Sequence, residues 1–200
     1  MAVIVIIRSF LVSINKRGIL GILVRGITVA GGSKSKNKGS GYERDLCKFL
    51  GGVFNGSFIR SANSGAFVGG FNAARKAKLS DTQIRGQKGD LISPDHMPKL
   101  VIEAKFYGEF RFHQLIQPGA VPQLDEWIAQ CLDASDEHDL WLICFKINLR
   151  GSFVVVPSKH AAEFTFGNHS VYNSEHGRFF VTEMTEFFTT NREAVLRLSA

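Results

Sequence analysis

The feature that most constrains this chain is a short β-hairpin that carries acidic residues on both strands. Residues 89–92 and 99–105 are two apolar runs, and the six residues between them contain two prolines and Asp95. Prolines and Asp suit a connection between neighbouring strands, so this pattern predicts a hairpin. Such a hairpin brings Asp90 of the first run close to Glu103 of the second.

The second run has charged side chains on one face of a predicted strand. Glu103 and Lys105 are two residues apart and share a face, while Ile102 and Ala104 point to the other. Charges in a core strand are costly unless they are paired or bind a metal. Asp90, Glu103 and the Ala104 backbone carbonyl could hold a hard divalent cation, with Lys105 acting on a water or a phosphate. The alternative is an exposed ion pair on an edge strand.

Asp90 followed by Glu103-Ala104-Lys105 resembles the signature of the PD-(D/E)XK nucleases, with Gly89 where the proline is usual. This version of the signature is similar to the one found in phage nucleases and Holliday-junction resolvases. The resemblance implies an α/β, restriction-endonuclease-like core, a mixed β-sheet flanked by helices in the order αβββαβ. It also implies Mg²⁺- or Mn²⁺-dependent cleavage of DNA, and Asp90, Glu103 and Lys105 as catalytic residues.

The charge of the chain is unevenly distributed. Seven of the 24 Lys and Arg residues lie in residues 1–38, which contain no Asp or Glu, so the other 162 residues hold 17 bases and 18 acids. Within these, residues 39–111 have 11 bases and 7 acids, whereas residues 112–200 have 6 bases and 11 acids. The candidate site thus lies in the basic part, as expected for a polyanionic partner such as DNA.

Residues 1–38 form a basic, apolar extension that we expect to be separate from a nuclease domain at 39–200. Arg8 and Arg25 interrupt its apolar runs, so no membrane span is predicted. It could be a membrane-surface or targeting segment, or the natural start could lie downstream, for example at Val29. The Gly, Ser and Lys residues of 31–39 predict a flexible linker.

The three cysteines are widely spaced at Cys47, Cys131 and Cys144. This spacing suits neither a disulfide framework nor structural zinc, so we expect a reducing cytoplasm. With the resemblance, this implies the cytoplasm of a bacterium or a phage-infected host cell.

A helix is predicted from Ser40, because Ser40 and Glu43 have the spacing of a capping box. In that interpretation Glu43 only caps the helix. The resemblance offers another role, since residues 39–44 look like the Gly-Ser-x-x-Glu-Arg start of resolvase-like nucleases, whose Glu completes the metal site.

A predicted strand at 54–60 leads into a Ser- and Gly-rich turn. By resemblance, Arg60 and Ser64 approach the DNA backbone, although Arg60 could equally pair with a carboxylate. Residues 65–89 are Gly-rich and basic, and we expect a flap over the substrate in which Lys88 contacts DNA; a loop with no role is the alternative.

The segment 106–117 is rich in aromatic residues, for which we favour packing over stacking on bases. A second helix is predicted from Pro122, with Trp127 on its apolar face. Trp127 and Gln130 resemble a Trp-x-x-Gln element of phage nucleases, which implies that Gln130 lies near the metal and the DNA.

Two dense apolar runs, 140–146 and 152–156, predict buried strands of one sheet. They extend the resemblance over a core at 39–157. A further strand near Phe179 and a helix at 192–198 are expected, without a function. The sequence as a whole predicts a metal-dependent endonuclease acting on branched DNA, and the resemblance implies a possible homodimer. A non-catalytic DNA-binding accessory protein and a repair or restriction-type nuclease of linear duplex are the alternatives.

Overall fold

The computed structural model describes residues 4–7, 10–14, 20–22, 32–62 and 80–200. The chain divides into two units, residues 1–35 and 36–200. In the first unit, β1 (Ile4–Ile7), β2 (Phe10–Ile14) and β3 (Leu20–Ile22) form an antiparallel sheet in the order β1-β2-β3. No helix among the described residues is long and apolar enough to cross a membrane.

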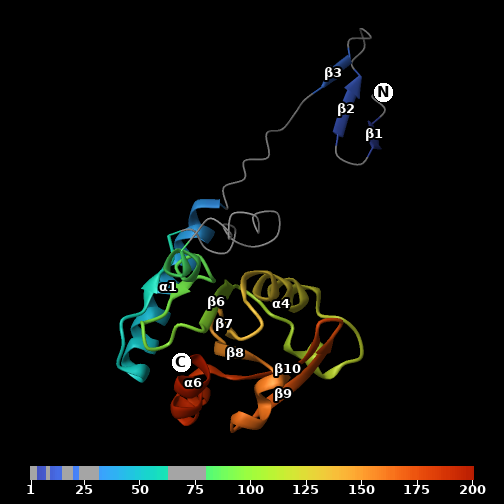
Figure 1. Cartoon of the computed structure of the whole chain (residues 1–200). Coiled ribbons are helices and arrows are strands. Elements are labelled where there is room, and N and C mark those ends of the chain that lie inside the picture. Colours follow the sequence, from blue (N-terminus) through green and yellow to red (C-terminus); the bar gives the residue numbers. More distant parts are fainter. Residues whose placement is uncertain (1–3, 8–9, 15–19, 23–31, 63–79) are drawn as a thin grey trace. The chain divides into compact units, whose positions relative to one another are not determined.

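The second unit contains a seven-stranded sheet in the order β4-β5-β6-β7-β8-β10-β9 (Figure 1). Its strands are β4 (Ile59–Arg60), β5 (Leu91–Ile92), β6 (Leu100–Tyr107), β7 (Leu140–Ile147), β8 (Gly151–Pro157), β9 (His169–Ser174) and β10 (Gly177–Glu183). Strands β6 and β7 are parallel and the other neighbours are antiparallel. The sheet is therefore mixed, as predicted.

The helices are α1 (Gly32–Phe54), α3 (Asp81–Arg85), α4 (Pro122–Ala134), α5 (Met184–Thr190) and α6 (Arg192–Ser199), with short 3₁₀ helices η2 (Phe112–Ile116) and η3 (Ser158–Glu163). Helix α4 forms the crossover between the parallel strands β6 and β7, the connection that such a pair requires. The order α1, β4, β5, β6, α4, β7 confirms the predicted αβββαβ core.

The sheet is covered on both faces. Buried residues of α1, α5 and α6 pack on the face that carries Ile102 and Leu142. Residues of α4 and the segment around η2 pack on the face that carries Val101 and Ile143. Strand β7 lies between these two clusters and is buried on both faces, which explains its uninterrupted apolar sequence.

Helix α1 starts earlier than the sequence predicts. It begins at Gly32, so the flexible linker expected at 31–39 is wrong for residues 32–39, and Ser40 is an interior residue rather than an N-cap. Tyr42, Leu46 and Leu50 form its buried stripe. Extending a packed helix adds about one hydrogen bond per residue, which offsets the low helix propensity of the Gly- and Ser-rich start.

The first strand of the domain is shorter than expected. The sequence predicts a strand from Phe54, but α1 continues through that residue and β4 contains only Ile59 and Arg60. The buried Phe54 belongs to the helical stripe, because it packs with Phe58 and Phe188. The later strand near Phe179 and the helix at 192–198 are both confirmed.

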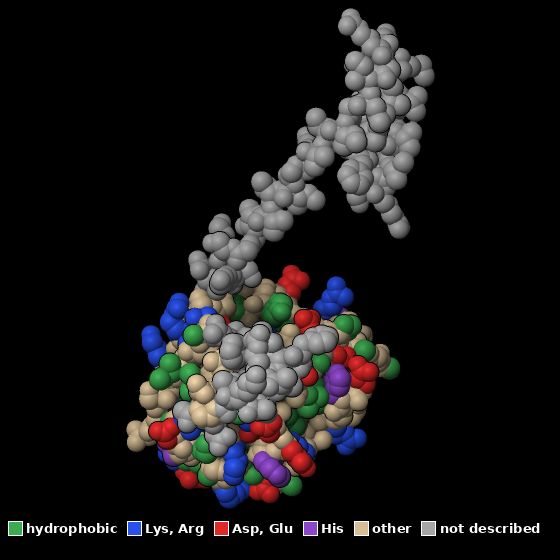
Figure 2. Space-filling model, turned by 45° about the horizontal axis from the view of Figure 1, so that its top comes forward, with side chains coloured by type: hydrophobic (Ala, Val, Ile, Leu, Met, Phe, Trp, Pro, Cys, Tyr) green, Lys and Arg blue, Asp and Glu red, His purple; other side chains and the backbone are tan. Residues whose placement is uncertain are grey.

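The surface of the second unit carries charges of both signs. On the face shown in Figure 2, Lys and Arg side chains are interspersed with Asp and Glu side chains. The thiols of Cys47, Cys131 and Cys144 are free.

Candidate active site

The predicted hairpin is present and its turn fixes Asp90 beside β6. Gly89 has a φ of +65°, and a Cβ there would lie 2.5 Å from the Ile102 carbonyl oxygen, so this turn requires glycine. The Asp90 N–H donates to that carbonyl at 2.8 Å, and the Asp90 carbonyl accepts from Ser61 N–H at 2.8 Å. Its carboxylate Oδ2 accepts from the Ala104 N–H at 2.8 Å. Hydrogen bonds therefore fix the position of both the main chain and the side chain of Asp90.

The Ala104 carbonyl shares this edge of β6 with the Asp90 carboxylate. In a strand, the N–H and C=O of one residue point to the same side. The Ala104 N–H points to Asp90, so its carbonyl also faces the β5 side. Among the described strands, β5 pairs with β6 at Leu91 and Ile102, before Ala104 is reached. The Ala104 carbonyl therefore lies on the side of β6 where the Asp90 carboxylate is held, and its role as a metal ligand stays a prediction.

Glu103 and Lys105 lie on the face of β6 that α4 covers. The Lys105 Nζ donates to Glu103 Oε1 at 2.7 Å and to Gln130 Oε1 at 2.6 Å. Gln130 comes from α4, and the side chains of Glu103 and Lys105 are only 7% and 16% exposed. The predicted exposed ion pair on an edge strand is therefore wrong, because β6 lies inside the sheet and this pair is largely buried.

The buried carboxylates affect each other's charge. Asp90 and Glu103 are each 5% exposed. Burial raises the pKa of Asp90 to about 7, repulsion from Glu103 adds to the effect, and Glu43 contributes further repulsion. For Lys105, burial acts to lower the pKa, but the attraction of Glu103 outweighs it and the pKa is raised. Asp90 thus lacks a full counter-charge, whereas Lys105 stays protonated.

Glu43 reaches the same region from α1. Its carboxylate Oε2 accepts from the Arg60 Nε of β4, and the side chains are 13% and 37% exposed, respectively. The sequence left open whether Arg60 pairs with a carboxylate or with DNA, and here it pairs with Glu43. The capping role of Glu43 is wrong because Ser40 lies inside α1.

The donor set suits a hard divalent cation. Within the described ranges, no group of three or more His, Cys, Asp and Glu side chains is arranged to hold a metal ion. Glu103 and Glu43 are instead paired with Lys105 and Arg60. By contrast, burial raises the pKa of Asp90 and repulsion from Glu103 adds to the effect, and a bound cation would relieve this repulsion. The oxygen atoms of Asp90 and Glu103 therefore fit such an ion, with Glu43 close enough to act on Asp90.

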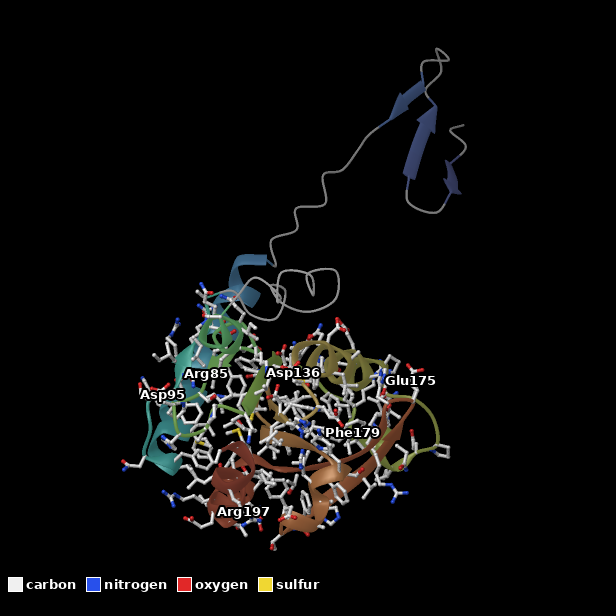
Figure 3. All side chains as sticks on the ribbon, in the orientation of Figure 1. Arg85, Asp95, Asp136, Glu175, Phe179 and Arg197 are labelled. Atoms are coloured by element: carbon white, nitrogen blue, oxygen red, sulfur yellow. The ribbon has the colours of Figure 1, made fainter. Side chains whose placement is uncertain are left out.

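Lys88 pairs with two acidic residues outside β6. Its ammonium contacts Asp136 at 2.8 Å and Asp139 at 2.6 Å, in the segment between α4 and β7, and its side chain is 11% exposed. Asp136 is labelled in Figure 3. These ion pairs fix the residues just before the Gly89 turn. The predicted contact of Lys88 with DNA stays a prediction, and it would compete with both carboxylates.

Two parts of the sequence hypothesis lie outside the described residues. These are Ser64 and most of the predicted flap, since residues 63–79 are not described. Of the flap, the structure describes α3 and the turn that leads to Asp90. Arg85 of α3 pairs with Asp95 of the hairpin connection at 2.5 Å, and Figure 3 labels both residues.

The aromatic segment after β6 packs against the fold, as favoured from the sequence. Phe110 stacks on Trp127 at 5.7 Å, and Phe112 lies 4.7 Å from Phe153, both measured between ring centroids. Tyr107 also contacts Trp127 at 5.1 Å. Trp127 therefore anchors α4 on β6, which sets the position of Gln130 one helical turn further along.

Sequence reasoning missed some partners that position the site. Asp136 and Asp139 anchor Lys88, and an acidic pair three residues apart directly after an amphipathic helix is a signal that could have suggested a counter-ion. From the sequence, Cys131 is only one of three widely spaced cysteines. Burial raises the pKa of its thiol, and repulsion from Glu103 adds to the effect, which places Cys131 close to the site.

A buried Asp on a hairpin turn and a Glu-x-Lys strand inside a mixed sheet define a nuclease domain of the restriction-endonuclease-like class. The sequence matches the family described as "Phage putative PDDEXK endonuclease" over residues 34–196. The chain belongs to this family. Searches among curated proteins and among solved structures gave no match.

Proposed function

We propose that this protein is a metal-dependent endonuclease that hydrolyses DNA phosphodiester bonds, with branched DNA as its substrate. The observation that carries the proposal is the pair of buried carboxylates, Asp90 and Glu103, beside the protonated Lys105 on β6. Burying these three charged groups lowers the stability of the fold, since buried charges are stable only when they are paired or bound to a cation. Membership of an endonuclease family supports a catalytic reason for keeping it.

Asp90, Glu103 and the Ala104 carbonyl would hold Mg²⁺ or Mn²⁺, with Glu43 completing the site. When bound, the ion supplies Lewis-acid polarisation of the phosphate and lowers the pKa of a bound water. Asp90 is held for this role by the Ala104 N–H and must be deprotonated to take it. Glu43 would exchange its partner Arg60 for the ion, which would free the guanidinium.

Lys105 would act on the reacting phosphate. Its ammonium is fixed between Glu103 and Gln130, and its raised pKa keeps it charged. A fixed positive charge in a site largely shielded from water stabilises negative charge that develops on the phosphate oxygens. Gln130 positions this ammonium through its side-chain oxygen, and Arg60 would bind the DNA backbone. Ser64 and Lys88 are proposed as further backbone contacts.

The preference for branched DNA rests on the similarity of residues 39–44 to the start of resolvase-like nucleases. A homodimer is proposed on the same ground, since a junction presents paired strands. The three free cysteines support a reducing location, for which we propose the cytoplasm of a bacterium or a phage-infected cell. The role of residues 1–38 as a separate extension is also part of the proposal, with a boundary close to the observed division after residue 35.

One observation favours a second function, that of a non-catalytic DNA-binding protein. Glu103 and Glu43 both have cationic partners within the chain, and no three-residue metal cluster is present among the described residues. In that case the charged network would serve only the structure.

A gel assay tests the proposed function. A labelled four-way junction and a linear duplex of the same sequence are incubated with Mg²⁺ or with EDTA, using the wild type and Glu103→Gln. The proposal expects Mg²⁺-dependent cuts near the branch with the wild type alone. Equal cutting of the duplex would support the nuclease activity and contradict the preference for branched DNA. Binding of both DNAs without any cutting would favour the accessory protein.

A further inference from the structure

A cavity of about 310 Å³ lies on the α4 face of the sheet, away from the β6 charges. It is open to solvent and lies between η2 and the facing ends of β8, β10 and β9. Its lining includes Phe112, Leu115, Phe153, Ser170, Val181 and Glu183. Figure 3 labels Phe179, which lies on the same face of β10 two residues before Val181. Nothing in the proposed chemistry uses this cavity.

The cavity is connected to the β6 charges by one row of paired residues across the sheet. Lys105 pairs with Phe145, Phe145 with Phe153, and Phe153 with Glu183. Neighbouring strands are about 4.8 Å apart, so three steps place Glu183 about 14 Å from Lys105 along this row. Stacked nucleotides rise about 3.4 Å each along a strand, so this span corresponds to about four nucleotides.

The lining suits a flat heteroaromatic group. Phe112 and Phe153 contact each other with ring centroids 4.7 Å apart and supply aromatic wall, while Leu115 and Val181 add apolar surface. Ser170 contributes a hydroxyl group that can donate or accept a hydrogen bond. Nucleobases are recognised by this combination of aromatic surface and a few polar groups at their edges.

Glu183 supplies a fixed acceptor at the lining. Its carboxylate accepts from the Glu186 N–H at 2.6 Å, which caps α5 and restricts the side chain. A carboxylate has about four acceptor positions, and this bond uses one of them. The remaining positions can accept from the exocyclic amino group of a base, as acidic side chains do with cytosine N4.

We propose that this cavity binds one nucleobase extruded from the DNA substrate, within about four nucleotides of the phosphate that is cut. The inference rests on the proposed nuclease function and adds a second contact point on the DNA. Because an unpaired or mismatched base is extruded at lower cost, the cavity would favour structured DNA over a regular duplex. It would thereby give the enzyme a physical basis for substrate choice.

The test uses a variant that fills the cavity and a matched control on the same strand. Ser170→Leu places a large side chain in the lining. Val171→Leu introduces the same residue at the next position, which points to the other face of β9 and is 39% exposed. Circular dichroism and thermal melting show whether both variants keep the fold.

The substrates are four-way junctions in which a fluorescent base, 2-aminopurine or pyrrolocytosine, replaces one nucleotide at successive positions from the cut. Such bases brighten when they leave the stack. Wild type and Val171→Leu should raise the fluorescence at one position, and Ser170→Leu should lose at least about nine-tenths of this rise. A mismatch at that position should tighten binding about tenfold for the wild type and not for Ser170→Leu.

Three results would overturn the inference. The first is no rise at any position while the wild type binds and cuts the DNA, and the second is an equal rise with Ser170→Leu. The third is calorimetric binding of free deoxynucleosides, lost in Ser170→Leu, without any rise in DNA; this would assign the cavity to a free nucleoside instead. Fluorescence anisotropy reports DNA binding in the same samples. If the wild type neither binds nor cuts DNA, the proposed function fails as well, and the missing anisotropy change identifies that case.

Discussion

The even-numbered and odd-numbered side chains of β6 meet different surroundings. Ile102, Ala104 and Phe106 belong to the apolar cluster under α1, α5 and α6. Glu103 and Lys105 face α4, where they pair with each other and with Gln130. Because the side chains of a strand alternate, a single strand can build the core on one face and hold reactive groups on the other.

This difference separates two kinds of cost. The apolar face is stabilised by burial, at about 25 cal/mol for each Å² of apolar surface removed from water. On the charged face, removing the groups from water costs free energy, which ion pairs and hydrogen bonds must offset. For the neighbouring Asp90 this cost is only partly offset, as its raised pKa shows. Changes on the two faces should therefore affect different measured quantities.

The largest expected effect is on activity. Glu103→Gln keeps the shape of the side chain but removes a charge from the proposed metal site. We expect the cleavage rate to fall by about a thousandfold, which corresponds to about 4 kcal/mol of transition-state stabilisation. Single-turnover cleavage of labelled DNA measures this. DNA affinity, measured by anisotropy, should stay within about threefold; a variant that still cuts at the wild-type rate would remove Glu103 from the chemistry.

The matching change on the apolar face is Ile102→Ala, one position earlier on the same strand. Ile102 is 1% exposed, so the substitution leaves a cavity and should lower the free energy of unfolding by about 2–5 kcal/mol. Urea unfolding measures the loss. The cleavage rate per folded molecule should change little. Loss of cutting without loss of stability would show that the two faces are not separate in function.

Lys105→Ala should lower the cleavage rate by about a hundredfold, the range that a well-placed catalytic group contributes. A matched control is Lys146→Ala, since Lys146 of β7 contacts the Phe106 ring at 5.5 Å on the other face. Its cleavage rate should stay within about threefold of the wild type. Equal losses in both variants would indicate a general effect of lysine removal on DNA binding.

The smallest effect concerns stability and pH in the metal-free protein. The pKa of Asp90 is about 7 in the folded state and near 3.8 without the fold, so the folded state binds the extra proton between these values. The stabilisation of the folded state by this proton is complete below about pH 4 and is lost as the pH rises through about 7. The melting temperature of the wild type should therefore fall more from about pH 5 to about pH 8 than that of Asp90→Asn, by a few degrees. If the melting temperatures of the two proteins changed equally with pH, Asp90 would not be the source of this pH dependence.

Much of this fold follows from local pattern. The turn residues between 92 and 99 and the two flanking apolar runs predicted the hairpin, and period-two alternation placed Glu103 and Lys105 on one face. Pro122 predicted the start of α4, and the resemblance of Trp127 and Gln130 to a Trp-x-x-Gln element implied the place of Gln130. These features depend on residues that are close in sequence, so the pattern contains enough information to predict them.

The features that were missed depend on contacts between distant residues. Lys88 pairs with Asp139, which is 51 residues away. The sequence left open that Arg60 pairs with a carboxylate but did not identify it as that of Glu43, 17 residues away. The early start of α1 at Gly32 has no apolar residue to signal it. Strand β9 is an edge strand with alternating exposed positions, and its short polar sequence is typical of a loop as well. Tertiary packing decides these cases, and local propensity does not.

Binding of a divalent cation tests the central claim, that the charged face of β6 exists to hold one. Mn²⁺ is titrated by calorimetry into the wild type and Glu103→Gln, each bound to a four-way DNA junction with phosphorothioate linkages that slow cleavage, at about pH 6.5. The account predicts saturable binding to the wild type with release of a proton, because Asp90 must ionise, and at least tenfold weaker binding to Glu103→Gln. Equal binding to both proteins, or no binding to the wild type, would contradict it.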